Sequence, residues 1–149
     1  MSKILKYYKH FTPVKIRFSD LDIVGHLNNA KYQTMLDEAR IAYFHDVLNW
    51  DKSSLNFNNV ISKISIDFLK SIEYGDEIFI YTRLFNIKTS SYDVHQLFVR
   101  KEDEKKEIVA TAQTLMAAFD YQTKMPTTFP EAYCETVRSF EEHAEILHQ

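Results

Sequence analysis

Residues 17–32 read Arg17-Phe18-Ser19-Asp20-Leu21-Asp22-Ile23-Val24-Gly25-His26-Leu27-Asn28-Asn29-Ala30-Lys31-Tyr32. The stretch holds two carboxylates, a histidine, two asparagines and one of the two glycines of the whole chain. A strand pattern precedes it and a helix pattern follows it. Chemically active side chains gathered where a strand passes into a helix are typical of a reaction centre carried by a loop.

The residues on either side predict how this loop is held. Residues 14–18 alternate apolar and charged side chains, which predicts a strand with one buried face. The chain then enters an irregular turn. Gly25 can adopt backbone angles that are closed to other residues, and it allows the chain to pass close to another group.

A long helix is predicted over residues 28–48. Asn28 and Asn29 are both preferred helix N-caps, and residues 30–48 contain no glycine or proline. The unpaired N–H groups of the first helical turn would lie near Asp22, at the positive end of the helix dipole. A carboxylate and donors for a developing oxyanion would then share one site, as acyl transfer requires.

Four further strands are predicted over residues 60–69, 78–87, 92–100 and 108–119, with a charged turn at 101–106. One strand, a helix and four antiparallel strands predict an α+β fold in which a curved antiparallel β-sheet wraps round a long central helix. A C-terminal helix is expected over about 130–147, packed on the rim of the sheet or on a neighbouring subunit. Its apolar stripe consists of Tyr133, Val137, Phe140, Ala144 and Leu147.

The motif D-x-D-x-x-G-H-x-N-N-x-x-Y, followed by Glu38-Ala39-Arg40 on the helix, resembles the 4-hydroxybenzoyl-CoA thioesterase-like branch of the hotdog-fold acyl-CoA thioesterases. The match is dense over residues 14–40, and the later strands and the turn at 123–126 are compatible with the family as far as about residue 130. Residues 88–91 depart from it, because many relatives have a glycine there and this chain has none.

The resemblance implies a site and an assembly. Asp22 corresponds to the catalytic carboxylate, and the oxyanion donor falls on the backbone N–H of Asn29 or an immediate neighbour. The residue types themselves add His26 to the catalytic candidates, because it could tune Asp22, hold the helix entry or serve as a general acid, with orientation favoured over proton transfer. The family implies a homodimer or homotetramer that holds the acyl chain between subunits, and no cofactor is needed. The expected substrate-binding residues are Gly25, Asn28, Tyr32 and Ser91.

The two other carboxylates of the motif, Asp20 and Glu38, have simpler expected roles. Asp20 shares the turn, and we expect it to bond the backbone or to support Asp22. Glu38 invites comparison with hotdog thioesterases that use a helical glutamate. It lies about three turns into the helix, however, so we expect a salt bridge with Arg40 or with a basic residue of another subunit.

The predicted function is hydrolysis of an acyl-CoA thioester to the free acid and coenzyme A. Asp22 either attacks the thioester carbonyl or deprotonates the attacking water. The alternatives are an enoyl-acyl hydratase or dehydratase on a related hotdog scaffold, and a non-catalytic acyl-binding module. The sequence leaves open the acyl group, the choice between coenzyme A and a carrier protein, and the basic residues that hold the phosphates, for which the candidates are Lys63, Lys70, Lys88 and Arg100.

Length, charge and composition exclude several other classes of protein. The 149 residues fit one domain spanning 1–149, and the net charge of −3 gives no basic surplus for nucleic acid. The single cysteine, Cys134, excludes an internal disulfide, and the histidines show no ligand-like spacing, so no metal site is expected. Residues 1–10 lack the apolar core of a signal peptide and no segment is long and apolar enough to span a membrane, so a cytoplasmic location is expected.

Overall fold

The computed structural model of the chain describes residues 2–50 and 59–141. None of the helices in these two ranges is long and apolar enough to cross a membrane. The elements follow one another as α1 (Ser2–Leu5), β1 (His10–Val14), a short 3-10 helix η1 (Phe18–Asp20), α2 (Asn29–Leu48), β2 (Asn59–Phe68), β3 (Glu77–Phe85), β4 (Ser91–Glu102), β5 (Lys105–Asp120), β6 (Met125–Pro126) and α3 (Glu131–Phe140).

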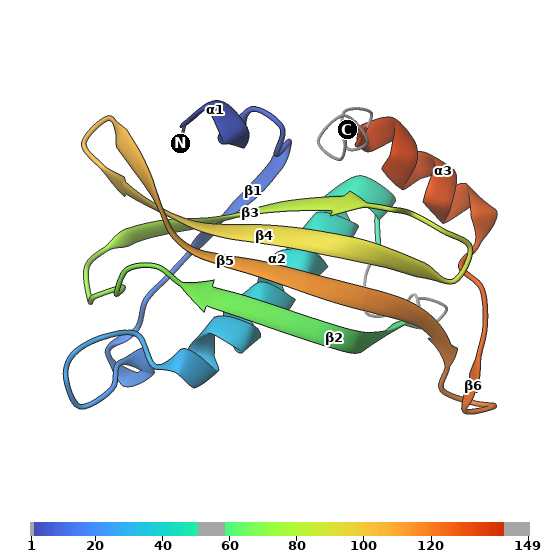
Figure 1. Cartoon of the computed structure of the whole chain (residues 1–149), viewed down its shortest axis with the longest axis horizontal. Coiled ribbons are helices and arrows are strands. Elements are labelled where there is room, and N and C mark those ends of the chain that lie inside the picture. Colours follow the sequence, from blue (N-terminus) through green and yellow to red (C-terminus); the bar gives the residue numbers. More distant parts are fainter. Residues whose placement is uncertain (1, 51–58, 142–149) are drawn as a thin grey trace.

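The strands within the described residues form one antiparallel sheet in the order β1-β3-β4-β5-β2, and the short β6 pairs with the end of β5. Figure 1 shows this sheet curling across α2, which runs behind the strands. The predicted curved sheet round a central helix is therefore confirmed. β1 and β2 are the lateral edges of the sheet, and no further strand of the described residues pairs with their outer sides.

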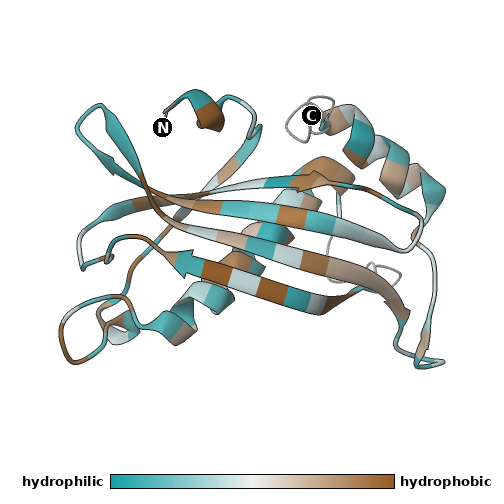
Figure 2. Cartoon of the chain, in the orientation of Figure 1, coloured by the Kyte–Doolittle hydropathy of each residue, from teal (hydrophilic) through white to brown (hydrophobic). Residues whose placement is uncertain are grey.

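The core lies between α2 and the concave face of the sheet. Leu36 and Ala39 of α2 are fully buried in one cluster with Ile78, Ile80 and Phe98 from the strands. Burying a large apolar side chain stabilises the fold by roughly 1.5 to 3 kcal/mol, so this cluster fixes the helix on the sheet. Figure 2 shows the corresponding alternation of hydrophobic and hydrophilic residues along β2 and β4.

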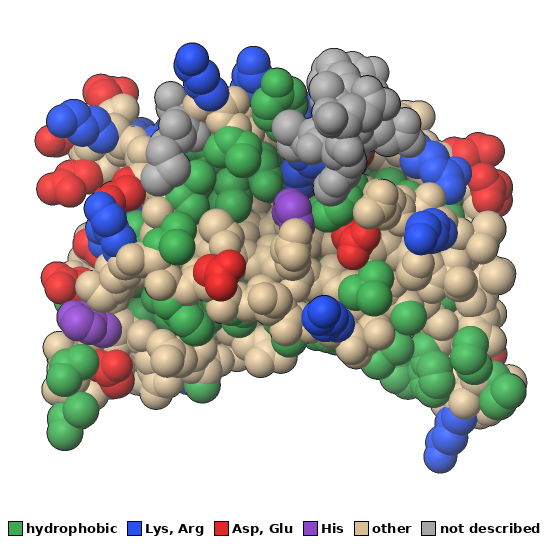
Figure 3. All heavy atoms as spheres, in the orientation of Figure 1, with side chains coloured by type: hydrophobic (Ala, Val, Ile, Leu, Met, Phe, Trp, Pro, Cys, Tyr) green, Lys and Arg blue, Asp and Glu red, His purple; other side chains and the backbone are tan. Residues whose placement is uncertain are grey.

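A second cluster lies on the opposite face of the sheet, under the segment that follows α1. Tyr8 packs there with Tyr81, Leu97, Val99 and Ile108, all of which are buried. Figure 3 shows this outer face, on which acidic and basic side chains are scattered and form no large patch of one sign. The N-terminal segment therefore covers apolar strand residues that face away from α2.

The strand predicted over residues 14–18 is wrong. β1 is His10–Val14, and the chain forms η1 shortly afterwards. Val14 pairs with Ile78, one residue from the start of β3, so among the described residues no strand continues opposite residues 16–18. Ile16 is nevertheless buried, which accounts for the apolar alternation that produced the prediction.

The other predicted strands and the central helix are confirmed with small shifts. The C-terminal helix expected over about 130–147 is described as Glu131–Phe140, and residues 142–147 lie outside the described residues. The central helix begins at Asn29, β2 is displaced by one residue, and the β4–β5 ladder extends to the pair Glu102 and Lys105. The turn between β3 and β4 lacks glycine, and Asn86 adopts the positive φ of 50° there. α3 packs on the rim, where Val137 lies in a cluster with Tyr43 of α2. The predicted stripe residues Ala144 and Leu147 lie outside the described residues.

A buried carboxyl group links α3 to the central helix. Glu141 follows α3 and accepts a hydrogen bond of 3.1 Å from Tyr43 Oη. Burial raises the pKa of Glu141 to about 7, while the hydrogen bond from Tyr43 and the positive charge of Arg83 act in the opposite direction. Since the pKa in the folded state exceeds that of the unfolded chain, the stability linked to this group is fully present below the unfolded pKa and is lost as the pH rises through about 7.

Glu141→Gln is therefore expected to flatten the pH dependence of stability. Between pH 5 and pH 8 the parent should lose on the order of 1 to 3 kcal/mol of unfolding free energy that the variant keeps. Urea denaturation at the two pH values measures the difference. Glu135→Gln, an exposed change on α3, serves as the control of equal charge change. Identical pH dependence in the parent and Glu141→Gln would contradict the prediction.

Candidate active site

The loop after η1 is folded around the carboxylate of Asp22. Asp22 Oδ1 accepts hydrogen bonds from the backbone N–H groups of Val24, at 3.0 Å, and of His26, at 3.1 Å. The backbone closes the same loop, because the Asp22 N–H donates to the carbonyl of His26 and the Gly25 N–H donates to that of Asp22. Among the described residues no donor to Oδ2 is found, and the side chain is exposed. One oxygen therefore holds the loop and the other faces solvent.

Gly25 supplies the conformation that closes this loop. Its φ is +84°, in the region that favours glycine. The expected close approach to another group is not found within the described part of the chain, since a Cβ built on Gly25 would meet nothing within 4 Å. Backbone strain, and not steric contact, therefore explains glycine at this position.

Gly25→Ala is expected to lower kcat/KM of the predicted thioester hydrolysis about tenfold and the free energy of unfolding by about 1 to 2 kcal/mol. A residue with a side chain is strained at this positive φ, and the loop that carries Asp22 should shift to relieve the strain. Gly25→Val should be worse, and Gly25→Asn should retain more activity than Gly25→Ala because asparagine tolerates positive φ better. Steady-state kinetics and thermal denaturation measure the three variants. A Gly25→Ala enzyme with the parent kcat/KM would refute this role.

Asp20 lies beneath the loop and bonds the backbone, as expected. Its side chain is 2% exposed and accepts a 2.9 Å hydrogen bond from the Arg17 N–H, while its carbonyl accepts one from the Asn28 N–H. The bond from the Arg17 N–H lowers the pKa of Asp20, with burial acting against it and the charges of Arg17 and Lys31 adding to the lowering. Asp20 is thus an ionised carboxylate that fixes the entry to α2.

The N-terminus of α2 lies directly after this loop. Asn28 is the N-cap, and its side chain accepts a 3.1 Å hydrogen bond from the Ala30 N–H. The Lys31 N–H donates to the Asn28 carbonyl, whereas among the described residues no acceptor is found for the N–H of Asn29. This N–H lies at the positive end of the helix dipole, four residues after Gly25. A backbone donor is thus left available where the Asp22 loop enters the helix.

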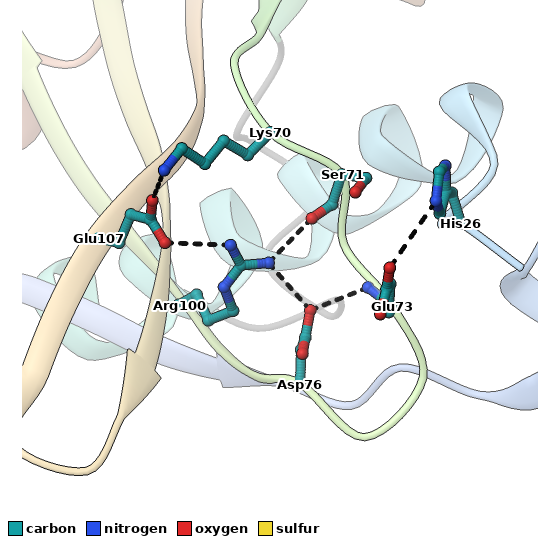
Figure 4. A network of polar contacts seen from close by, with 7 residues as sticks. All are labelled: His26, Lys70, Ser71, Glu73, Asp76, Arg100 and Glu107. Carbon is teal, nitrogen blue, oxygen red and sulfur yellow. Dashed lines mark hydrogen bonds and ion pairs between the residues drawn. The ribbon is translucent and has the colours of Figure 1, made fainter.

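His26 ties the loop to a neighbouring turn. The backbones of His26 and Glu73 form an isolated β-bridge, and the Leu27 N–H donates to the carbonyl of Ile72 at 2.7 Å. His26 Nε2 lies 3.8 Å from Glu73 Oε1. Figure 4 shows His26 reaching towards Glu73 from the loop before α2. The contacts of His26 thus hold the loop against this turn, and its orienting role stays a prediction.

Two of the predicted substrate-binding residues lie outside the Asp22 loop, Tyr32 in the first turn of α2 and Ser91 at the start of β4. Tyr32 is buried in the core, with ring centroids 4.8 Å from Phe68 and 5.0 Å from Phe98. Ser91 begins β4, whereas Arg100 of the same strand reaches the turn beside His26. Nine residues of extended strand span roughly 30 Å, so one chain does not bring Ser91 to the loop.

A groove of about 530 Å³ runs between α2 and the β2 edge of the sheet. No local sequence pattern indicated it, because its walls come from separate elements. Arg40 lies in its wall and pairs with Asp37. Of the two partners expected for Glu38, Arg40 is therefore bonded elsewhere, and a basic residue of another subunit stays a prediction. The groove is lined by Asp37, Arg40, Ile41, Phe44, Trp50, Asn59, Val60, Ile61, Met116 and Tyr121.

Two of the four basic residues considered for phosphate binding are already paired. Lys70 forms an ion pair with Glu107, and Arg100 contacts both Glu107 and Asp76. Within residues 2–50 and 59–141, no group of three or more His, Cys, Asp or Glu side chains is placed to hold a metal ion.

The curled antiparallel sheet, the central helix and the C-terminal helix define a hotdog fold of the 4-hydroxybenzoyl-CoA thioesterase type. Residues 16–137 match the model of the thioesterase-like superfamily, and the chain belongs to that family.

Solved structures agree with this assignment. A thioesterase from Thermus thermophilus, determined in complex with coenzyme A and Zn, is 29% identical, with a TM-score of 0.75 over 89% of this chain and 94% of that one. The fold is also shared with 4-hydroxybenzoyl CoA thioesterase from Pseudomonas sp. strain CBS-3, at 18% identity and a TM-score of 0.76 over 85% of this chain and 97% of that one.

One curated relative matches in sequence. The uncharacterized protein YsmA of Bacillus subtilis (strain 168) is 30% identical over 97 residues. The match covers 65% of this chain and 65% of the length of that relative.

Proposed function

We propose that this protein hydrolyses an acyl-CoA thioester to the free acid and coenzyme A, with Asp22 as the catalytic carboxylate. The observation that carries the proposal is the difference in environment between the two carboxylate oxygens of Asp22. Two backbone N–H groups hold Oδ1, and Oδ2 faces solvent. The coenzyme A complex of the Thermus thermophilus relative supports the choice of thiol carrier.

Two routes are compatible with this arrangement. In the first, Asp22 Oδ2 attacks the thioester carbonyl, the C–S bond breaks, and water hydrolyses the resulting mixed anhydride. In the second, Asp22 takes a proton from water as that water attacks the carbonyl, and the C–S bond of the tetrahedral intermediate then breaks to release the acid and the coenzyme A thiolate, which takes up the proton. In both routes the carbonyl oxygen gains negative charge, and the N–H of Asn29 at the start of α2 stabilises it. His26 orients the loop.

The proposed assembly is a homodimer or homotetramer in which β2 pairs with its two-fold mate. Antiparallel pairing of two β2 strands would bring the Asn59 end of one strand beside the Phe68 end of the other. Asn59 lines the groove, while Phe68 packs on Tyr32 in the first turn of α2. The groove of one subunit would thus approach the Asp22 loop of its mate, with Ser91 at the same end as the groove.

Within this assembly, the groove is the proposed acyl site and Gly25 and Asn28 shape the thioester end. Lys63 and Lys88 are the proposed contacts for the coenzyme A phosphates. Among the described residues neither forms an ion pair, in contrast to Lys70 and Arg100. Both are exposed, as a phosphate contact at a channel mouth requires.

The test is a thiol-trapping assay on purified protein with short, long and aromatic acyl-CoA thioesters, run beside a hydration assay with an enoyl-CoA. Release of coenzyme A from at least one thioester, abolished in Asp22→Asn, is the expected result. Hydration without release of thiol would identify a hydratase. Binding of acyl-CoA with neither reaction would identify a non-catalytic acyl-binding module.

A further inference from the structure

We propose that Arg100 is a positioning residue for Asp22. Its guanidinium fixes the turn at residues 71–76, and that turn holds the loop that carries the catalytic carboxylate. The inference rests on the proposed function of Asp22, but its first step is a structural coupling that can be measured without turnover.

Arg100 binds the turn at two points and the sheet at a third. Nη1 donates to the carbonyl of Ser71 at 2.9 Å and to Asp76 Oδ2 at 3.1 Å, while Nη2 donates to Glu107 Oε2 at 3.0 Å. The side chain is 19% exposed, so these bonds are partly shielded from water. Figure 4 shows the guanidinium between the turn and the β4–β5 strands.

The turn at residues 71–76 is bonded to the Asp22 loop, so the restraint that Arg100 places on the turn also acts on the loop. Asp76 Oδ2 also accepts from the Glu73 N–H at 2.9 Å, so Arg100 and Glu73 share one carboxylate oxygen. Glu73 forms the bridge with His26, and the His26 N–H donates to Asp22 Oδ1. Each step is a contact between neighbouring groups, and the path from Arg100 to Asp22 is continuous.

Arginine suits this position for a geometric reason. A planar guanidinium presents several N–H donors in a fixed fork, whereas the single ammonium of lysine cannot reach the three acceptors in the same geometry. Ile72 is fully buried in the core and anchors the turn independently of Arg100. Loss of Arg100 should therefore loosen the Glu73–Asp76 part of the turn without unfolding the protein.

The test compares Arg100→Lys and Arg100→Gln with Lys105→Gln, an exposed change in the same hairpin that removes the same charge as Arg100→Gln. The Arg100 variants are expected to lose about tenfold in kcat with KM within about threefold, since misplacement of a catalytic group acts on the chemical step. Asp76→Asn should resemble Arg100→Gln, and the double variant should lose less than the product of the two single effects.

Amide hydrogen exchange supplies the readout that needs no substrate. The Val24 and His26 amides should exchange about tenfold faster in Arg100→Gln and remain as in the parent in Lys105→Gln. Unchanged exchange, or a lower melting temperature with kcat within about twofold of the parent, would overturn the inference. Absence of thioester hydrolysis in the parent would instead refute the proposed function, and the exchange result would still decide the coupling.

Discussion

Asp22→Asn is expected to lower kcat at least about 100-fold, equivalent to about 2.7 kcal/mol of barrier, while the melting temperature stays within about 2 °C of the parent. Asparagine keeps an oxygen that can accept from the Val24 and His26 N–H groups, so the loop should retain its shape. It cannot attack a carbonyl as a carboxylate does, nor take a proton from water at neutral pH. Thiol release under saturating substrate measures kcat.

Asp20→Asn provides the matched control, because it makes the same chemical change two residues away. Asp20 is buried and bonded to Arg17, so this variant should lose stability and retain more activity than Asp22→Asn. An Asp22→Asn enzyme with kcat within about threefold of the parent, less than about 0.7 kcal/mol of barrier, would remove Asp22 from the mechanism.

The sequence predicted those elements whose formation depends on residues close together along the chain. The N-cap at Asn28 and the helix that follows were predictable, because capping and helix propensity act within a few residues. The turn at Gly25 was predictable for the same reason. The strand expected at 14–18 failed because pairing depends on where a distant strand begins, and β3 starts at Glu77.

The parts of the site that the sequence did not reveal depend on residues distant along the chain. Arg100 and Ser71 are 29 residues apart, and Arg100 was considered only as a phosphate contact. The groove combines α2, β2 and β5. Arg40 was one of two partners expected for Glu38, the other being a basic residue of another subunit. Residues three apart on a helix lie on the same side, and Arg40 pairs with Asp37.

The buried carboxylate of Asp20 shows how the loop and the helix are stabilised together. Its side chain accepts from the Arg17 N–H just before η1, and its backbone carbonyl accepts from the Asn28 N–H at the N-cap of α2. The ammonium group of Lys31 lies 3.8 Å from the carboxylate. One residue thus joins the two helical segments that flank the Asp22 loop.

Asp20→Ala is therefore expected to reduce the free energy of unfolding by about 2 to 4 kcal/mol, since it leaves the Arg17 N–H and the positive charge of Lys31 without their buried partner. The folded pKa of Asp20 is lowered, so its contribution is present above the unfolded pKa, near about 4, and is lost as the pH falls through the folded pKa. Urea denaturation should accordingly show the full difference between parent and variant at about pH 7 and a smaller one below about pH 4. Asp20→Asn should lose less than Asp20→Ala, because the amide oxygen can still accept from the Arg17 N–H. Equal stability of the parent and Asp20→Ala at neutral pH would show that the loop and α2 are held together without this carboxylate.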